Sequence, residues 1–382
     1  MKKKLLVFHR ALAPYNIDLF NELYKAFETD VYFFRKNLRS QKFDMEKLLN
    51  QLNFTPKFIT TGFEFRHKGR MIRFGYLKKI IQNKPDIILV WEYNLITFIT
   101  ALFTKIFYPR TKVYSLCDDT VDLAKNSSTI RKTGRLFCFM VLDGIVLDNE
   151  LVEEWYHKNF PKVKTKVFPI IQKEERLITI FNDAHSVSKE YIHRYKLKEK
   201  NILLFVGRLV EVKNLKFLLE VFSLYVAKNK NSVLILVGDG DKRFELIRLA
   251  EQLKIPEHVI FAGRYEHKEL YAWFKVADYF ILPSTWEPFG AVVNESLIAG
   301  VPVICSNLAG AACLITEKNG IIFNPYDKDE LLTIFSDVLC RKQNSINDSS
   351  NHFSLMPYTF HQKVNELISF LKEDEFVDEL VG

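Results

Sequence analysis

Short runs of apolar, often β-branched residues recur along the whole chain, and segments with helical periodicity separate most of them. In the first half these runs span Lys3–His9, Val31–Phe34, Asp86–Trp91, Lys112–Leu116 and Gly144–Asp148. In the second half they span Asn201–Gly207, Ser232–Gly238, His258–Gly263, Tyr279–Ser284 and Val301–Cys305. Such runs are typical of buried strands, and their alternation with helices predicts an α/β fold with parallel sheets.

Two successive series of strands and helices predict two doubly wound, Rossmann-like domains. A chain of 382 residues is long enough for two hydrophobic cores. We expect an N-terminal domain over residues 1–170, a linker region over 171–195 and a C-terminal domain over 196–354. An amphipathic helix at about residues 357–382 follows and is expected to pack back on the first domain.

The formal net charge is +8, and many of the basic residues fall within the first 79 positions. This bias favours an anionic partner for the N-terminal half, such as membrane phospholipid, a lipid diphosphate or nucleic acid. A solvated basic face is the alternative. The chain contains no recognised nucleic-acid module, so nucleic acid ranks lowest and we expect none as a partner.

The five cysteines have no paired spacing and lie mostly in apolar runs, which predicts buried thiols in a reducing compartment. The apolar start is too short for a signal peptide. The most apolar stretch, Leu95–Tyr108, is too short to span a bilayer and is expected to be a core helix. We therefore expect a cytoplasmic protein, with peripheral contact to the inner face of the cell membrane as an option.

A pair of glutamates flanks the Phe289–Gly290 dipeptide after the predicted strand at Tyr279–Ser284. Pro288 is typical of a first helical turn, and the helix it would open can end at Gly300. Glu287 would then lie in the loop at the carboxyl end of a strand, where open α/β sheets bind ligands. Glu295 would lie about two turns into the helix. The amides of Phe289, Gly290 and Ala291 would be free to bind an anion.

Two cations follow the first strand of the second half. The strand ends at Gly207, and Arg208 and Lys213 come before the next helix. Guanidinium and ammonium groups in one such loop suit a diphosphate. By contrast, Gly238-x-Gly240 lacks the last glycine of a dinucleotide fingerprint, and the neighbouring aspartates are expected to form a turn or a helix cap rather than a metal site.

Carboxylates also follow two strands of the first half. Asp118 and Asp119 come after Lys112–Leu116, and Glu92 comes directly after Asp86–Trp91. Their positions favour a role in binding substrate, with helix capping by either aspartate as the alternative. We expect Glu92 and Asp119 to serve the acceptor side.

The chain resembles the family-4 retaining glycosyltransferases of GT-B fold, in which two Rossmann-like domains face each other across a cleft. The resemblance rests on "FVGRLVEVKN", on "PSTWEPFGAVVNESLIAGVPVI" with two glutamates separated by seven residues, and on "GIIFNPYDKDEL". It is dense over residues 201–332 and looser before them, where "HRALAPYNIDLFNEL" is similar to members that build bacterial surface polysaccharides.

The resemblance implies a role for each matching residue. Arg208 and Lys213, beside Gly207, would hold and stabilise the departing nucleoside diphosphate, and amides near Gly290 and Ala291 would bind a phosphate. Glu287 would bind hydroxyls of the donor sugar, and Glu295 the ribose. Backbone groups near Arg264 and Tyr265 would meet the base.

Catalysis is expected to need Glu287, Arg208, Lys213 and Asp118 and no metal or other cofactor. The donor would be a nucleotide sugar and the acceptor a glycan or a polyprenyl-diphosphate-linked glycan.

Two departures from the family pattern leave other functions open. "HRALAPYN" lacks the Gly-Gly loop found in many relatives, and Cys117-Asp118 stands where many relatives have His-Asp. The alternatives are a non-catalytic glycan- or nucleotide-binding protein and a nucleotide-sugar epimerase or a phosphorylase of the same fold.

The segment Thr61–Lys79 mixes apolar side chains with Arg66, Lys68, Arg70 and Arg73. Such mixing predicts peripheral, salt-sensitive binding to anionic membranes, and an ordinary helix with buried aromatics is the alternative.

Overall fold

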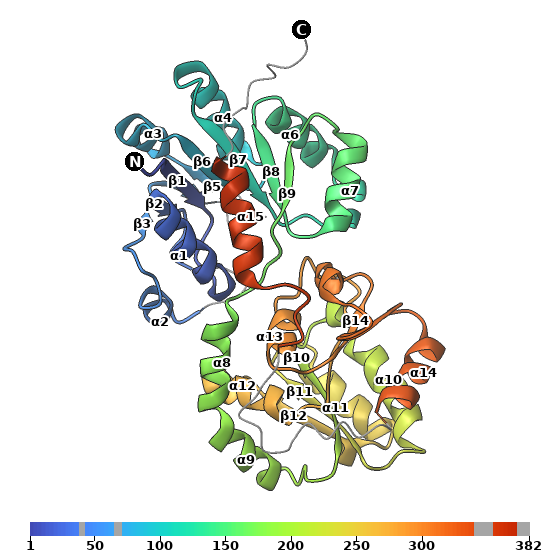
Figure 1. Ribbon diagram of the computed structural model, residues 1–382. Coiled ribbons are helices and arrows are strands. Elements are labelled where there is room, and N and C mark those ends of the chain that lie inside the picture. Colours follow the sequence, from blue (N-terminus) through green and yellow to red (C-terminus); the bar gives the residue numbers. More distant parts are fainter. Residues whose placement is uncertain (38–42, 65–70, 340–353, 373–382) are drawn as a thin grey trace. The chain divides into compact units, whose positions relative to one another are not determined.

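The computed structural model describes residues 1–37, 43–64, 71–339 and 354–372. The chain forms two compact units, each described here by itself: unit 1 comprises Met1–Ile170 and Phe360–Gly382, and unit 2 comprises Ile171–Thr359. Both are α/β units with parallel main sheets (Figure 1).

Unit 1 has a seven-stranded sheet of order β3-β2-β1-β6-β7-β8-β9 in which all neighbours are parallel. The strands are β1 (Lys4–His9), β2 (Glu28–Phe33), β3 (Lys57–Phe58), β6 (Ile87–Trp91), β7 (Lys112–Cys117), β8 (Gly144–Leu147) and β9 (Thr165–Val167). The strand order reverses direction between β1 and β6, so the loops after these two strands flank the switch point of the sheet. A separate antiparallel pair joins β4 (Gly62–Glu64) to β5 (Met71–Arg73).

Helices cover both faces of this sheet. They are α1 (Ile17–Ala26), α2 (Met45–Leu49), α3 (Tyr76–Asn83), α4 (Leu95–Phe107), α5 (Val121–Asn126), α6 (Thr129–Phe139), α7 (Glu150–Asn159) and α15 (Phe360–Lys372). Val113 of β7 packs in one core cluster with Tyr76 and Ile80 of α3. The next residue, Tyr114, points to the other face, where its ring lies 5.2 Å from that of Phe370 on α15. The alternation along β7 thus places the C-terminal helix on unit 1, beside α1 (Figure 1).

Unit 2 repeats the scheme with a six-stranded parallel sheet of order β12-β11-β10-β13-β14-β15. Its strands are β10 (Asn201–Val206), β11 (Ser232–Val237), β12 (Val259–Gly263), β13 (Tyr279–Leu282), β14 (Val303–Ser306) and β15 (Gly320–Phe323). Its helices are α8 (Glu174–Asp183), α9 (His185–Arg194), α10 (Leu215–Val226), α11 (Arg243–Gln252), α12 (His267–Val276), α13 (Val292–Ile298) and α14 (Lys328–Val338). Here the switch point lies between β10 and β13.

Three expectations about local structure need correction. Residues 171–195 are not an open linker, because they form α8 and α9, and the Tyr191 ring of α9 stacks 4.2 Å from the Trp273 ring of α12. The stretch Thr61–Lys79 is not one helix: its described part forms the β4–β5 pair and the start of α3. Arg66, Lys68 and Arg70, which carried the membrane prediction, lie outside the described residues.

The third correction concerns α4, which was expected to be a core helix. Its fully buried residues are threonines and an alanine, Ile96, Ile99 and Phe103 pack against the core in part, and several other large apolar side chains are exposed. No helix in the described part of the chain is long and apolar enough to cross a membrane. Cys117, Cys138 and Cys305 are buried thiols, as the sequence predicts, whereas Cys313 is only half-buried and Cys340 is not among the described residues.

Candidate functional site

Lys213 and Glu287 meet at the switch point of unit 2. Lys213 ends a short turn after β10, and Glu287 lies in the loop between β13 and α13. The Lys213 ammonium donates to Oε2 of Glu287, and the two side chains are only 13% and 15% exposed. The loops themselves are tied together, because the amide of Thr285 donates to the carbonyl of Val212 at 3.0 Å. The structure therefore brings together two residues that the sequence predicted for one site.

The backbone around Glu287 is fixed from both sides. Its carbonyl accepts from the amide of Gly310 at 3.1 Å, and the carbonyl of Phe289 accepts from Ala311 at 2.7 Å. Gly290 has a φ of +99°, and a Cβ there would lie 2.8 Å from Cδ2 of Leu282. Only glycine adopts this turn at low energetic cost, and the turn helps to fix the backbone conformation next to Glu287.

The helix that follows begins later than the sequence suggested. Pro288 lies before α13 rather than in its first turn, because the Gly290 turn intervenes. Glu295 consequently lies in the first turn of α13 and not two turns inside it. Within the described residues, the amides of Phe289, Gly290 and Ala291 donate no hydrogen bond. These donors were the predicted phosphate contacts.

Glu295 belongs to a separate polar group within unit 2, formed by helices α8, α12 and α13 and by Gln172 just before α8. Its Oε1 accepts from Nε2 of Gln172 at 3.1 Å and from the hydroxyl of Tyr271 at 3.4 Å. Arg176 in turn donates to Oε1 of Gln172 at 2.7 Å. Burial raises the pKa of Glu295, and Gln172, Arg176 and Tyr271 oppose that rise. Sequence reasoning missed Gln172, whose position before α8 had been assigned to a linker.

The loop after β10 packs closely against the loop after β11. A Cβ on Gly238 would lie 1.8 Å from the carbonyl oxygen of Gly207, and one on Gly240 would lie 2.2 Å from that of Leu209. The two glycines of the VGDG segment thus serve this close backbone contact, and Asp239 closes the turn by accepting from the amide of Gly240 at 2.9 Å.

The packing of this turn leaves Arg208 at the surface. Its guanidinium is exposed and has no ion pair within the described parts of the chain. It is therefore available to an anion beside Lys213.

Arg264 and Tyr265 follow β12, the edge strand of the sheet. Arg264 pairs with Glu266 at 2.6 Å, and the Tyr265 ring lies 5.8 Å from that of Tyr191. Strand β11 lies between β12 and β10, after which Lys213 comes, and among the described residues no contact joins Arg264 or Tyr265 to Lys213.

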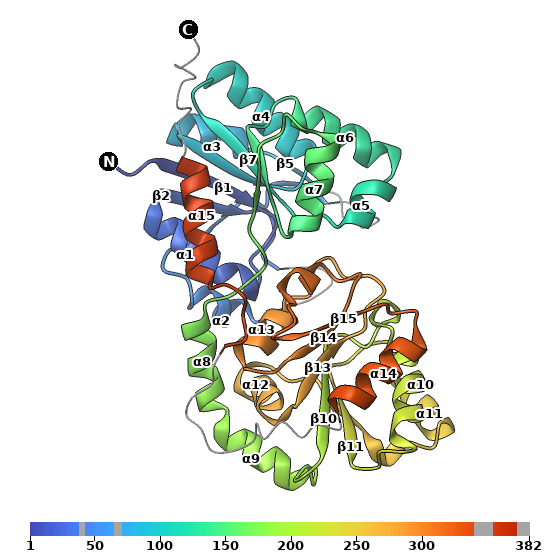
Figure 2. The same cartoon turned by 45° about the vertical axis from the view of Figure 1, so that its right-hand side comes forward.

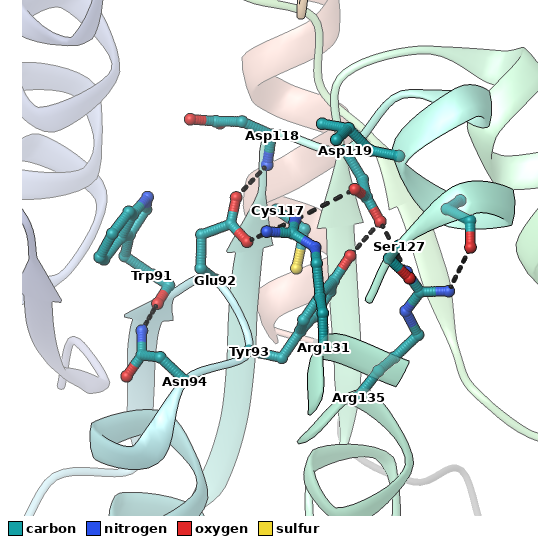
Figure 3. A network of polar contacts seen from close by, with 12 residues as sticks. Trp91, Glu92, Tyr93, Asn94, Cys117, Asp118, Asp119, Ser127, Arg131 and Arg135 are labelled. Atoms are coloured by element: carbon teal, nitrogen blue, oxygen red, sulfur yellow. Dashed lines mark hydrogen bonds and ion pairs between the residues drawn. The ribbon is translucent and has the colours of Figure 1, made fainter. Parts of the chain in front are cut away.

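A second polar cluster lies at the switch point of unit 1 (Figure 3). Arg131 of α6 donates to Oε2 of Glu92 at 3.2 Å and to Oδ1 of Asp119 at 3.1 Å. Oδ2 of Asp119 accepts from the hydroxyls of Tyr93 and Tyr156, and Arg135 lies 3.5 Å away. Asp119 has no exposed side-chain surface and orders the cluster from within, and its predicted place on the acceptor side stays a prediction.

Glu92 is held in a left-handed backbone conformation with a φ of +58°. Its carbonyl accepts from the hydroxyls of Thr97 at 2.7 Å and Ser115 at 2.9 Å, and its amide donates to Leu116 at 2.7 Å. These bonds offset the cost of a conformation that non-glycine residues rarely adopt. Burial and the charge of Asp118 raise the pKa of Glu92 to about 7, although Arg131 opposes the rise.

Asp118 donates its amide to Oε1 of Glu92 at 3.3 Å, while its own carboxyl points away from Asp119 (Figure 3). The pKa of Asp118 is raised by burial and by Asp119, against the charges of Arg10 and Arg131. Asp148, which directly follows β8, was not singled out in the sequence. It is buried, and its Oδ2 has no hydrogen-bond partner within the described residues.

The described part of the chain contains no group of three or more His, Cys, Asp or Glu side chains placed to hold a metal ion.

Comparisons with known proteins agree with this architecture. Residues 188–347 match the family "Glycosyl transferases group 1". An uncharacterized glycosyltransferase of Methanocaldococcus jannaschii is 34% identical over 134 residues, which cover 35% of this chain and 34% of that protein. An uncharacterized protein from the cps region of Klebsiella pneumoniae is 27% identical over 208 residues, covering 52% of this chain and 56% of that protein. The chain thus spans about a third to a half of the length of these relatives.

Among solved structures, the Anabaena protein HepE in complex with UDP aligns with a TM-score of 0.68 and 17% identity, over 96% of this chain and 95% of that one. The fold is therefore the GT-B fold that the sequence predicted, and the residues that match the group 1 glycosyl transferases lie within unit 2.

Proposed function

We propose that this protein is a retaining glycosyltransferase of family 4 that moves a hexosyl group from a nucleoside-diphosphate sugar to a glycan or a lipid-linked glycan. The observation that carries the proposal is the Lys213–Glu287 pair at the switch point of a group 1 glycosyl transferase domain, next to the unpaired cation Arg208. Switch points of parallel sheets are where such folds bind nucleotides. The UDP bound in the HepE crystal structure is consistent with a nucleotide-sugar donor.

Lys213 and Glu287, together with neighbouring groups of unit 2, would bind different parts of the donor. Lys213 and Arg208 place positive charge where the diphosphate departs, and unpaired amides at Gly290 and Ala291 can bind the same phosphates. Glu287, whose backbone is fixed, would accept hydrogen bonds from hydroxyls of the sugar. Glu295 would bind the ribose once its contact with Gln172 is exchanged for the hydroxyls.

The transfer breaks the bond between the anomeric carbon and the phosphate oxygen and forms one to an acceptor oxygen on the same face. The electron pair of the broken bond stays on the diphosphate, and the acceptor hydroxyl gives its proton to the departing phosphate. This route needs neither a carboxylate nucleophile nor a metal ion. We assign the acceptor side to Glu92 and Asp118 in unit 1, which can accept hydrogen bonds from sugar hydroxyls.

The pathway and the cellular location are the most specific parts of the proposal. We propose work in surface-polysaccharide assembly, for which the Klebsiella relative from a cps region offers distant support. We also propose that the protein acts in the cytoplasm at the inner face of the cell membrane, where polyprenyl-diphosphate-linked acceptors would be presented.

The first experiment finds the donor. A panel of uridine and guanosine diphosphate sugars is tested for an increase in melting temperature, and the sugar that stabilises is then incubated with candidate acceptors. We expect free nucleoside diphosphate and a product with the same anomeric configuration as the donor, with unchanged turnover when a metal chelator is present. Isomerised sugar nucleotide would instead indicate an epimerase, and binding without sugar release a non-catalytic protein.

The second experiment tests the residues. Lys213→Ala and Glu287→Ala should each lower turnover by about a hundredfold or more, because each removes a group aimed at the transition state. Lys242→Ala is the matched control, since Lys242 also pairs with a glutamate in this domain, at 2.7 Å from Glu211, but at an exposed site. Near-normal turnover in both site variants would refute the assignment.

A further inference from the structure

The outward surface of α4 is apolar, although the helix already packs Ile96, Ile99 and Phe103 against the core of unit 1. Thr97, Thr100, Ala101 and Thr104 face the sheet and are at most 1% exposed. The exposed positions of the helix are Leu95, Leu102, Ile106 and Phe107. A helix between a protein core and water usually exposes polar side chains instead. The exposed apolar residues imply that the outer face of α4 meets something other than water.

Helix α6 also exposes large apolar side chains. Its buried positions include the charged Arg135, which is 2% exposed and bonds to the carbonyl of Ala124 at 3.0 Å. Ile130 is 72% exposed, Phe137 is 51% exposed and Met140 directly after the helix is 79% exposed, and the polar Lys132 and Thr133 are exposed beside them. Two neighbouring helices thus both expose large apolar side chains, which argues against a chance feature of a single helix.

The two outward surfaces are joined. The rings of Phe98 on α4 and Phe137 on α6 lie 5.9 Å apart, and the two helices pack against each other on unit 1 (Figure 2). We call the combined surface the α4–α6 face. Its exposed members are Leu95, Leu102, Ile106, Phe107, Ile130, Leu136, Phe137 and Met140. Contiguous apolar surfaces of this kind are rare on proteins that contact only water.

The charges on and around the face are positive. The sequences of α4 and α6 contain no aspartate or glutamate. Lys105 of α4 is neutralised by Asp143 at 2.7 Å, whereas Lys132 of α6 and Arg110 just after α4 are exposed. The face therefore combines a large apolar centre with cations at its edge.

We propose that the α4–α6 face docks on the surface of a bilayer that contains anionic phospholipid. Apolar side chains at such an interface enter the acyl boundary, and nearby cations meet the headgroups. Helices that face lipid also direct small and hydroxyl-bearing residues toward the protein, as α4 does. A second copy of the chain fits less well, because a two-fold contact through this face would bring like cations together.

This face consists of described residues and is distinct from the basic segment Thr61–Lys79 that the sequence suggested. The proposal names the surface behind the membrane attachment in the proposed function. It can be tested without any substrate, so its failure would leave the transferase assignment untouched.

The experiment is co-sedimentation of the full chain with phosphatidylcholine vesicles and with vesicles containing phosphatidylglycerol. We expect binding to the anionic vesicles, reduced about tenfold or more in the double variant Phe137→Ser with Met140→Ser. Ile106→Ser on α4 is a second, independent variant. The matched control is Phe244→Ser, because Phe244 is 78% exposed on α11 of unit 2. Circular dichroism confirms that each variant is folded.

A second arm separates charge from apolar contact. Lys132→Glu with Arg110→Glu should remove the preference for anionic vesicles, and Lys230→Glu in unit 2 should not. Wild-type binding to neither kind of vesicle would overturn the proposal, as would equal binding by the Phe137–Met140 variant and the wild type. A dimer in analytical ultracentrifugation that the same variant dissociates, without vesicle binding, would assign the face to a second copy instead.

Discussion

Replacing Glu92 with glutamine should change how the stability of unit 1 depends on pH. The Glu92 side chain is 14% exposed, and its pKa rises from 4.5 to about 7 in the folded protein. A carboxyl with a raised pKa binds more protons in the folded state, so its contribution to stability falls as pH rises through this window. Glutamine has nearly the same shape but cannot ionise, so the Glu92→Gln variant does not lose stability through this titration.

The size of the effect follows from the shift. A rise of about 2.5 pKa units corresponds to about 3 kcal/mol, since one unit is about 1.4 kcal/mol. We therefore expect the free energy of unfolding of Glu92→Gln, relative to the wild type, to increase by about 2–3 kcal/mol between about pH 4.5 and about pH 7.5. The neighbours Asp118, Asp119 and Arg131 are present in both proteins, so their direct contributions largely cancel in the comparison.

The assay is urea unfolding read by pulsed hydrogen exchange of peptides from β6 and β7, which follows unit 1 by itself. Glu46→Gln, at an exposed position of α2, is the control and should give a difference that does not vary with pH. If the Glu92→Gln difference were equally flat, to within about 0.5 kcal/mol, the carboxyl would not be held in its neutral form and our account of the cluster would be wrong.

Three further substitutions test other features. Asp119→Ala should lower the stability of unit 1 by about 3–5 kcal/mol in urea unfolding, because it leaves Arg131 and Arg135 without their buried partner; a cost below about 1 kcal/mol would contradict this role. Gly238→Ala should destabilise unit 2 by about 2 kcal/mol or more, since its Cβ would meet the carbonyl of Gly207, and unchanged thermal unfolding would show that the two loops can separate. Thr100→Val should stabilise unit 1 by about 1 kcal/mol in urea unfolding, because the buried Thr100 hydroxyl has no hydrogen-bond partner within the described residues. Destabilisation would indicate a bound water at that hydroxyl.

Much of the candidate site in unit 2 could be predicted from the sequence because strands and loops have local signatures. Apolar runs located the strands, and the polar residues Lys213 and Glu287 lie in the loops that follow the carboxyl ends of β10 and β13. The position of Glu295 was less well predicted. Helix starts depend on turn geometry, and the left-handed Gly290 delays α13 by several residues relative to Pro288.

The polar cluster of unit 1 was predicted only in part. Adjacent aspartates cannot be told apart in a sequence, yet Asp118 points outward and Asp119 inward because successive residues leave an extended chain on opposite sides. The partners Tyr156 and Arg135 come from helices far along the chain, and no local pattern identifies them.

The sequence by itself determined the order of strands and helices, the doubly wound class of each unit and the loops that carry charge at the strand ends. These features depend on periodicity and on turn residues, which act over a few positions. Only the tertiary structure decided which side chains face one another and which face of a helix is buried. An apolar stretch such as Leu95–Phe107 predicts a helix, but its direction is set by packing against the sheet, and in α4 the threonines are turned inward. Burial is a property of the whole fold, since it depends on neighbours that are distant in the chain.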